Sequence, residues 1–551
     1  MQLPRNLIGT VFRGDKTVLV IFLSNCNYQN EASGVWSLLM ITEDLNGHTA
    51  AQIGLGENLY QQVAVRISEL IEHGTLRPGE RVPSVRKCSA QQSVSIATVM
   101  QAYRLLENRG VIEARPQSGY YVRARRWSPA PEPEMSRPAL RPVKVRVSDL
   151  ILEVVKAGRD PKLVRFGATL PSPELFPIKE LNRTMAAAAR RAPMAAHAYE
   201  VPPGNRALRV QVARRAMEAG CTLAPDDIIT TVGVTEAMNL CLRAVAKPGD
   251  VIAIESPTFF NILQIIESLG MRACEIPTYP REGICLDELE KRLKCCGIKA
   301  CLFMLNYSNP LGSCMPDDKK RKLVEMLTSR QIPLIEDDIY GDLTFGSRRP
   351  KSAKAFDKEG WVLLCDSFTK TLSPGSRVGW VAPGRFKARV EFLKFVNTSA
   401  TASLPQMAVA EFLQNGGYDH HLRKIRRLYA AQMQRMSEAI TRYFPAGTKL
   451  TRPAGGMCLW IELPPEINAL ALYHRAMAAG ISIAPGPIFC AKQKFENFIR
   501  INCGNPWSDI IENAIRKLGE IAGMMGSGDH WAPKQKAGPQ RRLEQSAFAA
   551  A

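Results

Sequence analysis

Length, composition and charge bound what this chain can be. At 551 residues it is too long for one compact hydrophobic core, so two or more domains are expected. Its 46% hydrophobic and 23% charged residues are ordinary for a soluble globular protein, but its net charge of +20 is not. Such a basic excess favours a polyanionic partner, nucleic acid before an anionic membrane surface, with a merely basic surface as the alternative.

The cysteines and apolar runs argue against several protein classes. None of the 14 cysteines forms a Cys-x-x-Cys pair, and most lie inside apolar runs. This pattern favours a reducing cytoplasm and argues against a zinc ribbon or a disulfide framework, so no metal site is expected. No apolar run is long enough to span a bilayer, so no membrane partner is expected. Residues 1–56 carry no pattern that connects them to the rest and are left unassigned, with Met40 as an alternative start.

Residues 57–125 carry the pattern of a small α+β domain. Apolar residues recur at helical spacing from Leu59 to Ile71, and a shorter helix follows Ser84. A third helix begins at Ser95, a good N-cap, and a hairpin with a basic, glycine-containing tip comes after it. Three helices followed by a hairpin predict a winged helix-turn-helix. Such modules place the third helix in the major groove of double-stranded DNA and use the wing for phosphates.

This segment resembles the GntR-type DNA-binding domain. The resemblance lies in Pro83–Arg86, Ser95–Val99, Ala102–Glu107 and Gly119–Val122. It implies an operator in double-stranded DNA as the partner, contacted by Ser84, Arg86, Ser95, Thr98, Arg115 and Gly119. The alternatives are that Ser95 only caps its helix and that Arg86 only pairs with a neighbour.

Two positions depart from the GntR pattern. Cys88-Ser89 stands where an apolar pair is usual, and Ile96 stands where many members carry arginine. The second change removes one guanidinium that could read a base.

A proline-rich linker is predicted for residues 126–147. It holds Pro129, Pro131, Pro133, Pro138 and Pro142, too many for a helix or a central strand. A semi-extended segment of this kind reaches roughly 60 Å at about 3.1 Å per residue, enough to carry the first domain well away from the second.

Residues 148–525 alternate short apolar strands with longer helical patterns. The runs at 228–232, 251–254, 300–304, 333–336 and 361–365 predict buried strands of an α/β fold with a largely parallel sheet. Ligands of such sheets bind beyond the carboxyl ends of the strands. Residues 526–551 are rich in Gly, Ser, Pro and charged residues and are expected to be a disordered tail.

Side chains suited to one cofactor follow these strands. Lys370 lies in a Ser/Thr/Gly-rich turn, where an amine can condense with a carbonyl cofactor. In a pyridoxal 5'-phosphate site Lys370 would form the Schiff base, and Asp337 would keep the pyridine nitrogen protonated. Asn309 and Tyr340 would bond the ring's phenolic oxygen, and Phe259 would stack on the ring.

The phosphate and a substrate carboxylate also have candidate partners. The phosphate would be held by Gly233, Val234, Thr235, Ser367 and Arg377. Arg500 would bind an incoming carboxylate as a bidentate pair. Considered one at a time, each residue has a structural explanation: Lys370 is a solvated surface lysine, Asn309 a turn residue, Tyr340 a core residue and Arg500 part of a structural ion pair. Their occurrence together, each after a strand, favours the cofactor site, with Lys370, Asp337 and Tyr340 as its catalytic residues.

Residues 163–519 resemble the fold-type I aminotransferases, with Lys370 at the aldimine position. Two residues depart from the commoner pattern: Leu311 stands in place of threonine and Phe259 in place of tyrosine or tryptophan. Tyr199 matches the tyrosine that reaches the neighbouring subunit's phosphate in this fold. The resemblance therefore implies a domain-swapped homodimer.

The order of the domains resembles the MocR subgroup of bacterial transcription regulators. The function it implies is a cytoplasmic regulator, nucleoid-associated when bound to DNA, that senses an amino compound or pyridoxal phosphate by aldimine exchange at Lys370. An active aminotransferase with a secondary DNA-binding module is the alternative, because Arg500 is retained. A DNA-binding protein with an empty, vestigial fold is the third. Activator and repressor both stay open.

Overall fold

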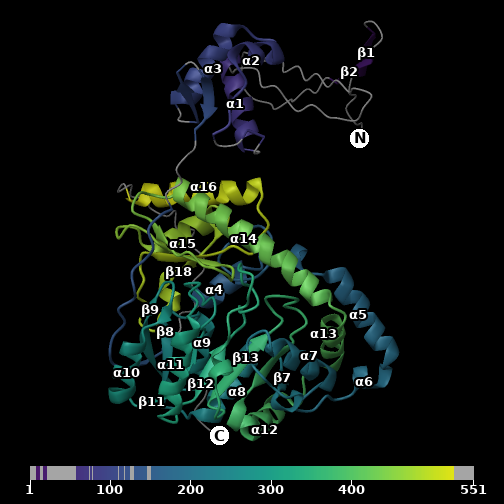
Figure 1. Cartoon of the computed structure of the whole chain (residues 1–551), viewed down its shortest axis with the longest axis vertical. Helices are drawn as coiled ribbons and strands as arrows, with labels where there is room; N and C mark the ends of the chain where they lie inside the picture. Colours follow the sequence, from purple (N-terminus) through teal and green to yellow (C-terminus); the bar gives the residue numbers. More distant parts are fainter. Residues whose placement is uncertain are drawn as a thin grey trace, which may run out of the picture. The chain divides into compact units, whose positions relative to one another are not determined.

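The computed structural model describes residues 8–12, 17–21, 58–72, 75–76, 79–108, 111–116, 118–123, 129–145 and 150–526. They fall into two units, Met1–Ser128 and Pro129–Ala551, shown in Figure 1. Within the unassigned segment, β1 (Ile8–Phe12) and β2 (Thr17–Ile21) pair antiparallel. The predicted disordered tail lies outside the described residues apart from Gly526.

The first unit contains the predicted three helices and hairpin. Its elements are α1 (Leu59–Glu72), α2 (Val85–Gln92), α3 (Ile96–Asn108), β3 (Ile112–Arg115) and β4 (Gly119–Val122). Val99, Tyr103 and Leu106 of α3 are fully buried, as its helical spacing requires. Cys88 joins the same core at 3% exposure, so the thiol takes the place of the usual apolar residue.

The proline-rich segment lies along the second unit over residues 129–145. The backbone carbonyl of Pro131 accepts from Leu450 N at 2.9 Å, and Ala139 O accepts from the Arg292 guanidinium at 3.0 Å. Its last residues form β5 (Val143–Lys144), which pairs with β9 (Arg272–Tyr279). The predicted semi-extended linker therefore does not stand away from the second unit over 129–145, because its backbone carbonyls accept hydrogen bonds from that unit.

A nine-stranded sheet forms the centre of the second unit. Its strands, in spatial order, are β10 (Gly283–Ile284), β9, β8 (Val251–Ser256), β11 (Ile298–Phe303), β12 (Leu334–Asp337), β13 (Val362–Ser367), β14 (Gly379–Ala382) and β7 (Ile229–Thr231), with β5 beside β9. β9, β8, β11, β12 and β13 run parallel, while β14 is antiparallel to both β13 and β7. The predicted strands are all present, and the largely parallel α/β fold is confirmed.

Both faces of this sheet are buried because residues alternate between two cores. Ile252 and Ile254 of β8 pack in one core, and Val251 and Ala253 pack in the other. Helices on both sides cover the sheet (Figure 1). The helices of this part are α5 (Ile178–Arg191), α6 (Pro193–His197), α7 (Arg206–Ala216), α8 (Val234–Val245), α9 (Phe260–Ser268), α10 (Leu286–Cys295), α11 (Asp317–Thr328), α12 (Lys387–Thr398) and α13 (Ser403–Gln414). Of these, α8, α9 and α10 contact strands of the sheet, while α5 and α6 pack on α13.

A smaller, four-stranded sheet completes the second unit. Its strands are β15 (Lys449–Leu450), β16 (Cys458–Glu462), β19 (Phe498–Asn502) and β18 (Ala484–Pro485). A separate parallel pair joins β6 (Val164–Arg165) to β17 (Ile481–Ser482). The helices here are α4 (Leu150–Ala157), α14 (Gly417–Tyr443), α15 (Ala469–Ala478) and α16 (Asp509–Gly526). Among the described residues no helix is both long and apolar enough to cross a membrane.

Candidate functional site

The strand ends of the large sheet bring the predicted side chains to one edge. The register pairs Asp337, the last residue of β12, with Cys365 of β13, and Ser367 with Gly379 of β14. Gly379 in turn faces Thr231 at the end of β7, two residues before Gly233. Residues far apart in the chain therefore meet where the parallel strands end.

Lys370 lies in the turn after β13 and is partly buried. Its Nζ donates a hydrogen bond of 2.6 Å to the backbone oxygen of Thr169. Burial lowers the pKa of Lys370 to about 8, and the nearby Arg500 acts in the same direction. A lower pKa leaves more of the amine neutral near pH 7, the form in which it is a nucleophile.

Asp337 is buried at 1% exposure beside this lysine. Its Oδ1 accepts a hydrogen bond of 3.2 Å from Ile339 N, and it forms no ion pair with a described residue. Burial raises the pKa of Asp337 to about 7. A buried carboxyl without a cation is stabilised by a ligand that brings a protonated nitrogen.

Asn309 and Arg500 converge on Thr169, and Tyr340 lies beside Asn309. Asn309 Nδ2 lies 3.3 Å from Thr169 Oγ1 and 3.5 Å from Tyr340 Oη, while the Arg500 guanidinium bonds Thr169 Oγ1 and, at 2.8 Å, Gly167 O. Arg500 is fully buried on β19, and burial lowers its pKa. Asn309 Oδ1 and Arg500 Nε have no hydrogen-bond partner among the described residues. An unpaired buried acceptor near an unpaired buried donor fits a polar ligand.

The backbone around Gly233 forms an anion cradle at the start of α8. Gly233 has φ 79°, and a Cβ there would lie 2.5 Å from Arg377 Nη2, so only glycine fits. Arg377 is exposed and donates to Val232 O at 2.9 Å. Thr235 Oγ1 donates to Asn261 Oδ1 at 3.1 Å, and Ser367 Oγ donates to Thr369 Oγ1 at 3.0 Å. Free amides at a helix N-terminus, with hydroxyls and a guanidinium nearby, suit a phosphate.

Phe259 and Tyr199, two further residues predicted to bind the cofactor, are less buried than Asp337 and Arg500. Phe259 follows β8 and is half-buried, with its ring centroid 4.6 Å from that of Phe260. Tyr199 is 84% exposed. Its predicted contact with a neighbouring subunit stays a prediction.

Sequence reasoning missed Thr169 and Cys458. Thr169 accepts from the Lys370 amine, yet it lies in an irregular stretch after β6 where no periodicity marks it. The Cys458 thiol lies beside the same groups: burial raises its pKa, while Arg500 and Lys370 act to lower it. Only the small residues Gly167-Ala168 between apolar runs hinted at a close approach here.

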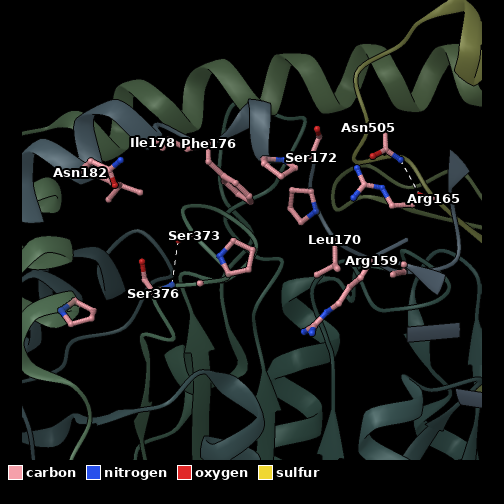
Figure 2. A pocket seen from close by; sticks show the side chains of 18 of the residues that line it. Arg159, Arg165, Leu170, Ser172, Phe176, Ile178, Asn182, Ser373, Ser376 and Asn505 are labelled. Carbon is pink, nitrogen blue, oxygen red and sulfur yellow. Dashed lines mark hydrogen bonds between the residues drawn. The ribbon is translucent and has the colours of Figure 1, made fainter. Parts of the chain in front are cut away.

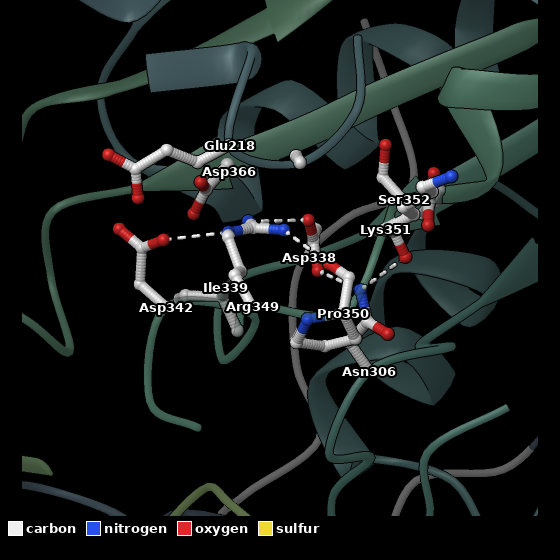
Figure 3. A network of polar contacts seen from close by, with 12 residues as sticks. Glu218, Asn306, Asp338, Ile339, Asp342, Arg349, Pro350, Lys351, Ser352 and Asp366 are labelled. Atoms are coloured by element: carbon white, nitrogen blue, oxygen red, sulfur yellow. Dashed lines mark hydrogen bonds and ion pairs between the residues drawn. The ribbon is translucent and has the colours of Figure 1, made fainter. Parts of the chain in front are cut away.

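A buried ionic network, shown in Figure 3, includes Asp338 and Asp342, which lie next to the Asp337–Tyr340 turn in the chain. Arg349 donates to Asp338 and to Asp342 at 2.7 Å each, and Asn306 Nδ2 donates to Asp338 at 2.8 Å. Although burial opposes it, Arg349 and Arg215 hold the pKa of Asp342 below its usual range. Side chains flanking Asp337 and Tyr340 are thereby fixed in place.

A cavity of about 670 Å³ opens beside the lysine turn (Figure 2). It is lined by Ala168 and Leu170, on either side of Thr169, and by Ser373–Ser376 just after Lys370. Arg159 and Arg165 add positive charge, and no carboxylate lies among the described lining residues. The cavity therefore offers a positively charged approach to the site.

The predicted DNA contacts lie at helix ends and on the hairpin of the first unit. Ser84 Oγ accepts from Lys87 N at 3.3 Å and Ser95 Oγ from Thr98 N at 3.1 Å, so both serines cap helices. Thr98 and Ser95 also share a hydroxyl bond of 2.8 Å, and Arg86 is exposed.

The wing residues are Arg115 and Gly119, which face each other beside the turn of the hairpin. Arg115 is paired with Glu113 at 2.9 Å. Gly119 has φ 99° and approaches Arg81. The tip of the wing is therefore basic, and Glu113 neutralises part of its positive charge.

Comparison with known proteins adds independent findings. The family models "Bacterial regulatory proteins, gntR family" and "Aminotransferase class I and II" match residues 59–122 and 175–518. The chain is 40% identical over 462 residues to the uncharacterized HTH-type transcriptional regulator YdcR of Escherichia coli, covering 84% of this chain and 98% of YdcR. It is 38% identical to YjiR of the same organism, another protein named as an HTH-type regulator.

Solved structures of aminotransferases also match. LysN, an α-aminoadipate aminotransferase of Thermus thermophilus complexed with N-(5'-phosphopyridoxyl)-L-leucine, has a TM-score of 0.64 and 29% identity, over 70% of this chain and 96% of LysN. The predicted resemblances to a GntR-type module and to the aminotransferase fold are confirmed.

Proposed function

The chain belongs to the MocR type of HTH-type transcriptional regulators, and we propose that it is a regulator whose large unit binds pyridoxal phosphate and senses an amino compound. Its winged helix-turn-helix would bind an operator in double-stranded DNA. The observation that carries this proposal is the convergence of Lys370, Asn309 and Arg500 on Thr169, with Asp337 beside the lysine and buried polar atoms left for a ligand.

The residues present suit the cofactor group by group. Pyridoxal phosphate supplies an aldehyde that condenses with amines and a ring that stabilises negative charge. Lys370 offers a partly buried amine of lowered pKa, and Asp337 offers a carboxyl at the end of the neighbouring strand. The Gly233 cradle and Arg377 would hold the phosphate.

Arg500 would orient the amino compound. Its guanidinium is buried, held by Gly167 O and the Thr169 hydroxyl, and keeps one unpaired N–H. A fixed, desolvated guanidinium binds a carboxylate as a bidentate pair. Such a group favours an amino acid over a simple amine as the signal.

The exposed cations of the first unit would contact DNA. Arg86 on α2 and Arg115 on the wing are candidates for phosphate contacts. Ser95 and Thr98, at the capped start of α3, are candidates for further DNA contacts. Tyr199, with 84% of its surface exposed, is proposed to complete the phosphate site of a second copy in a domain-swapped homodimer.

Absorbance of the full-length protein titrated with pyridoxal phosphate tests the proposal. We expect a visible band that borohydride fixes as a mass increase on the peptide carrying Lys370. Lys370→Ala removes the amine and should abolish the band and the mass increase. Lys358→Ala, which changes an exposed lysine, is the matched control and should bind normally. A band that persists in Lys370→Ala rejects the assignment of the lysine.

Retention of Arg500 also favours a second candidate, an active aminotransferase. Turnover with a panel of amino acids and 2-oxoglutarate separates the two. A pure regulator changes its spectrum on adding the amino compound without repeated turnover. Multiple turnovers at ordinary enzyme rates, about 1–1,000 per second, would establish the enzyme instead.

A further inference from the structure

Residues 130–144, called the strap below, reach the cofactor edge of the large sheet through one hydroxyl. Thr278 N on β9 donates to Ser136 Oγ at 3.1 Å, and Ser136 Oγ donates to Ser256 O on β8 at 2.5 Å. The residue in register with Ser256 is Pro277, which has no N–H to offer. The Ser136 side chain therefore bridges the carboxyl ends of two parallel strands.

The bridged position is the start of the turn that carries Phe259. Ser256 is the last residue of β8 and is 1% exposed. Thr258, also buried, donates its N–H to Phe489 O at 2.9 Å, so both ends of the short turn are fixed. Ser136 thus helps to position the aromatic ring expected to stack on the cofactor.

A second anchor of the strap reaches the loop that carries Asn309. Glu132 forms an ion pair with Arg281. The backbone oxygen of Arg281 accepts from Cys314 N at 2.9 Å, and Cys314 forms a bridge with Asn306 at the base of the loop. Two loops of the candidate site are therefore contacted from the same segment.

Polar and apolar contacts both hold the strap, and parts of it remain exposed. Leu140 is 53% exposed, and the Arg137 side chain is 87% exposed. Its contacts reach both sheets: Pro131 O bonds Leu450 of β15, and β5 pairs with β9. Pro133 is buried, and Ala130 and Val143 pack against the two cores, so release of the strap would also expose apolar surface.

We infer that docking of the strap and occupancy of the Lys370 site favour each other, with Ser136 as the positioning residue between them. This inference rests on the proposed function. A ligand that needs Phe259 in place stabilises the docked strap, and by linkage the docked strap raises the affinity for the ligand. Because the strap is the chain that joins the two units, its release would lengthen the tether of the winged helix.

Hydrogen exchange of the full-length protein, with and without pyridoxal phosphate, tests this coupling. We expect the cofactor to slow exchange of the strap amides by about fivefold or more, the lower end of ordinary coupling between sites. Ser136→Ala should weaken cofactor binding by the same factor and remove the protection. Ser136→Thr keeps the hydroxyl and should restore both, while Arg137→Ala, one residue away and exposed, should change neither.

Two outcomes overturn the inference. One is a wild-type strap whose exchange does not respond to bound cofactor, a result that needs no variant to fold. The other is a Ser136→Ala protein that binds the cofactor as tightly as wild type. Failure of the wild-type protein to bind pyridoxal phosphate at all is a separate result and rejects the proposed function.

Discussion

Burial sets the protonation of the two ionisable groups at the centre of the site. Lys370, with a pKa of about 8, and Asp337, with a pKa of about 7, both lie closer to neutrality than they do in water. Without a ligand, the charged form of each group is disfavoured because the surrounding region has a low dielectric constant. The groups that make the site reactive are therefore also groups that weaken the cofactor-free fold.

The stability of an Asp337→Asn variant should reveal this cost. The folded-state pKa of Asp337 is raised by burial to about 7, so the stability it contributes is present below its unfolded pKa and lost as pH rises through about 7. Without cofactor, the variant should be more stable than wild type by about 4 kcal/mol at pH 8, since the pKa is raised by about three units and each unit corresponds to about 1.4 kcal/mol, and nearly equal at pH 4. Urea unfolding at the two pH values measures the difference. A variant less stable than wild type at pH 8 would contradict the raised pKa.

The positions of side chains relative to strand ends were predictable from sequence, whereas contacts made by irregular segments were not. Lys370, Asp337 and Asn309 follow apolar runs whose pattern marks strands, and the parallel sheet brings those ends together. Thr169 follows a two-residue strand, and Arg349 lies in a loop. Their contacts depend on tertiary placement, which no period of two or 3.6 residues encodes.

The network around Arg349 should be essential to the turn that carries Asp337 and Tyr340. Arg349→Met leaves Asp338 buried without its cation and Asp342 with Arg215 in place of two arginines, and we expect a loss of about 3–5 kcal/mol in the free energy of unfolding. Urea unfolding of the full-length protein measures it. Arg348→Met removes an exposed neighbouring arginine and is expected to change stability by under about 0.5 kcal/mol. Equal stability of the two variants would show that the network is not a support.

At the scale of the whole molecule, the sequence indicated the parts but not the state of the segment between them. A basic winged helix and a cofactor-binding fold follow from periodicity and motif, since each has its own core. The strap was expected to be a semi-extended spacer between the two units, because proline excludes helices and central strands. Anchoring through single carbonyls and one hydroxyl leaves no trace in hydrophobic pattern, so only the structure shows it.

The central claim is that an amino compound acting at Lys370 changes operator binding. The most direct test is the affinity of the cofactor-loaded protein for an operator selected with it, measured while amino acids are titrated at fixed salt. We expect the effective amino acid to shift the affinity of wild type by about fivefold or more and to leave Lys370→Ala unchanged. Arg86→Ala should bind more weakly at every concentration. An equal response from Lys370→Ala, or none from wild type to any amino acid, would contradict the account.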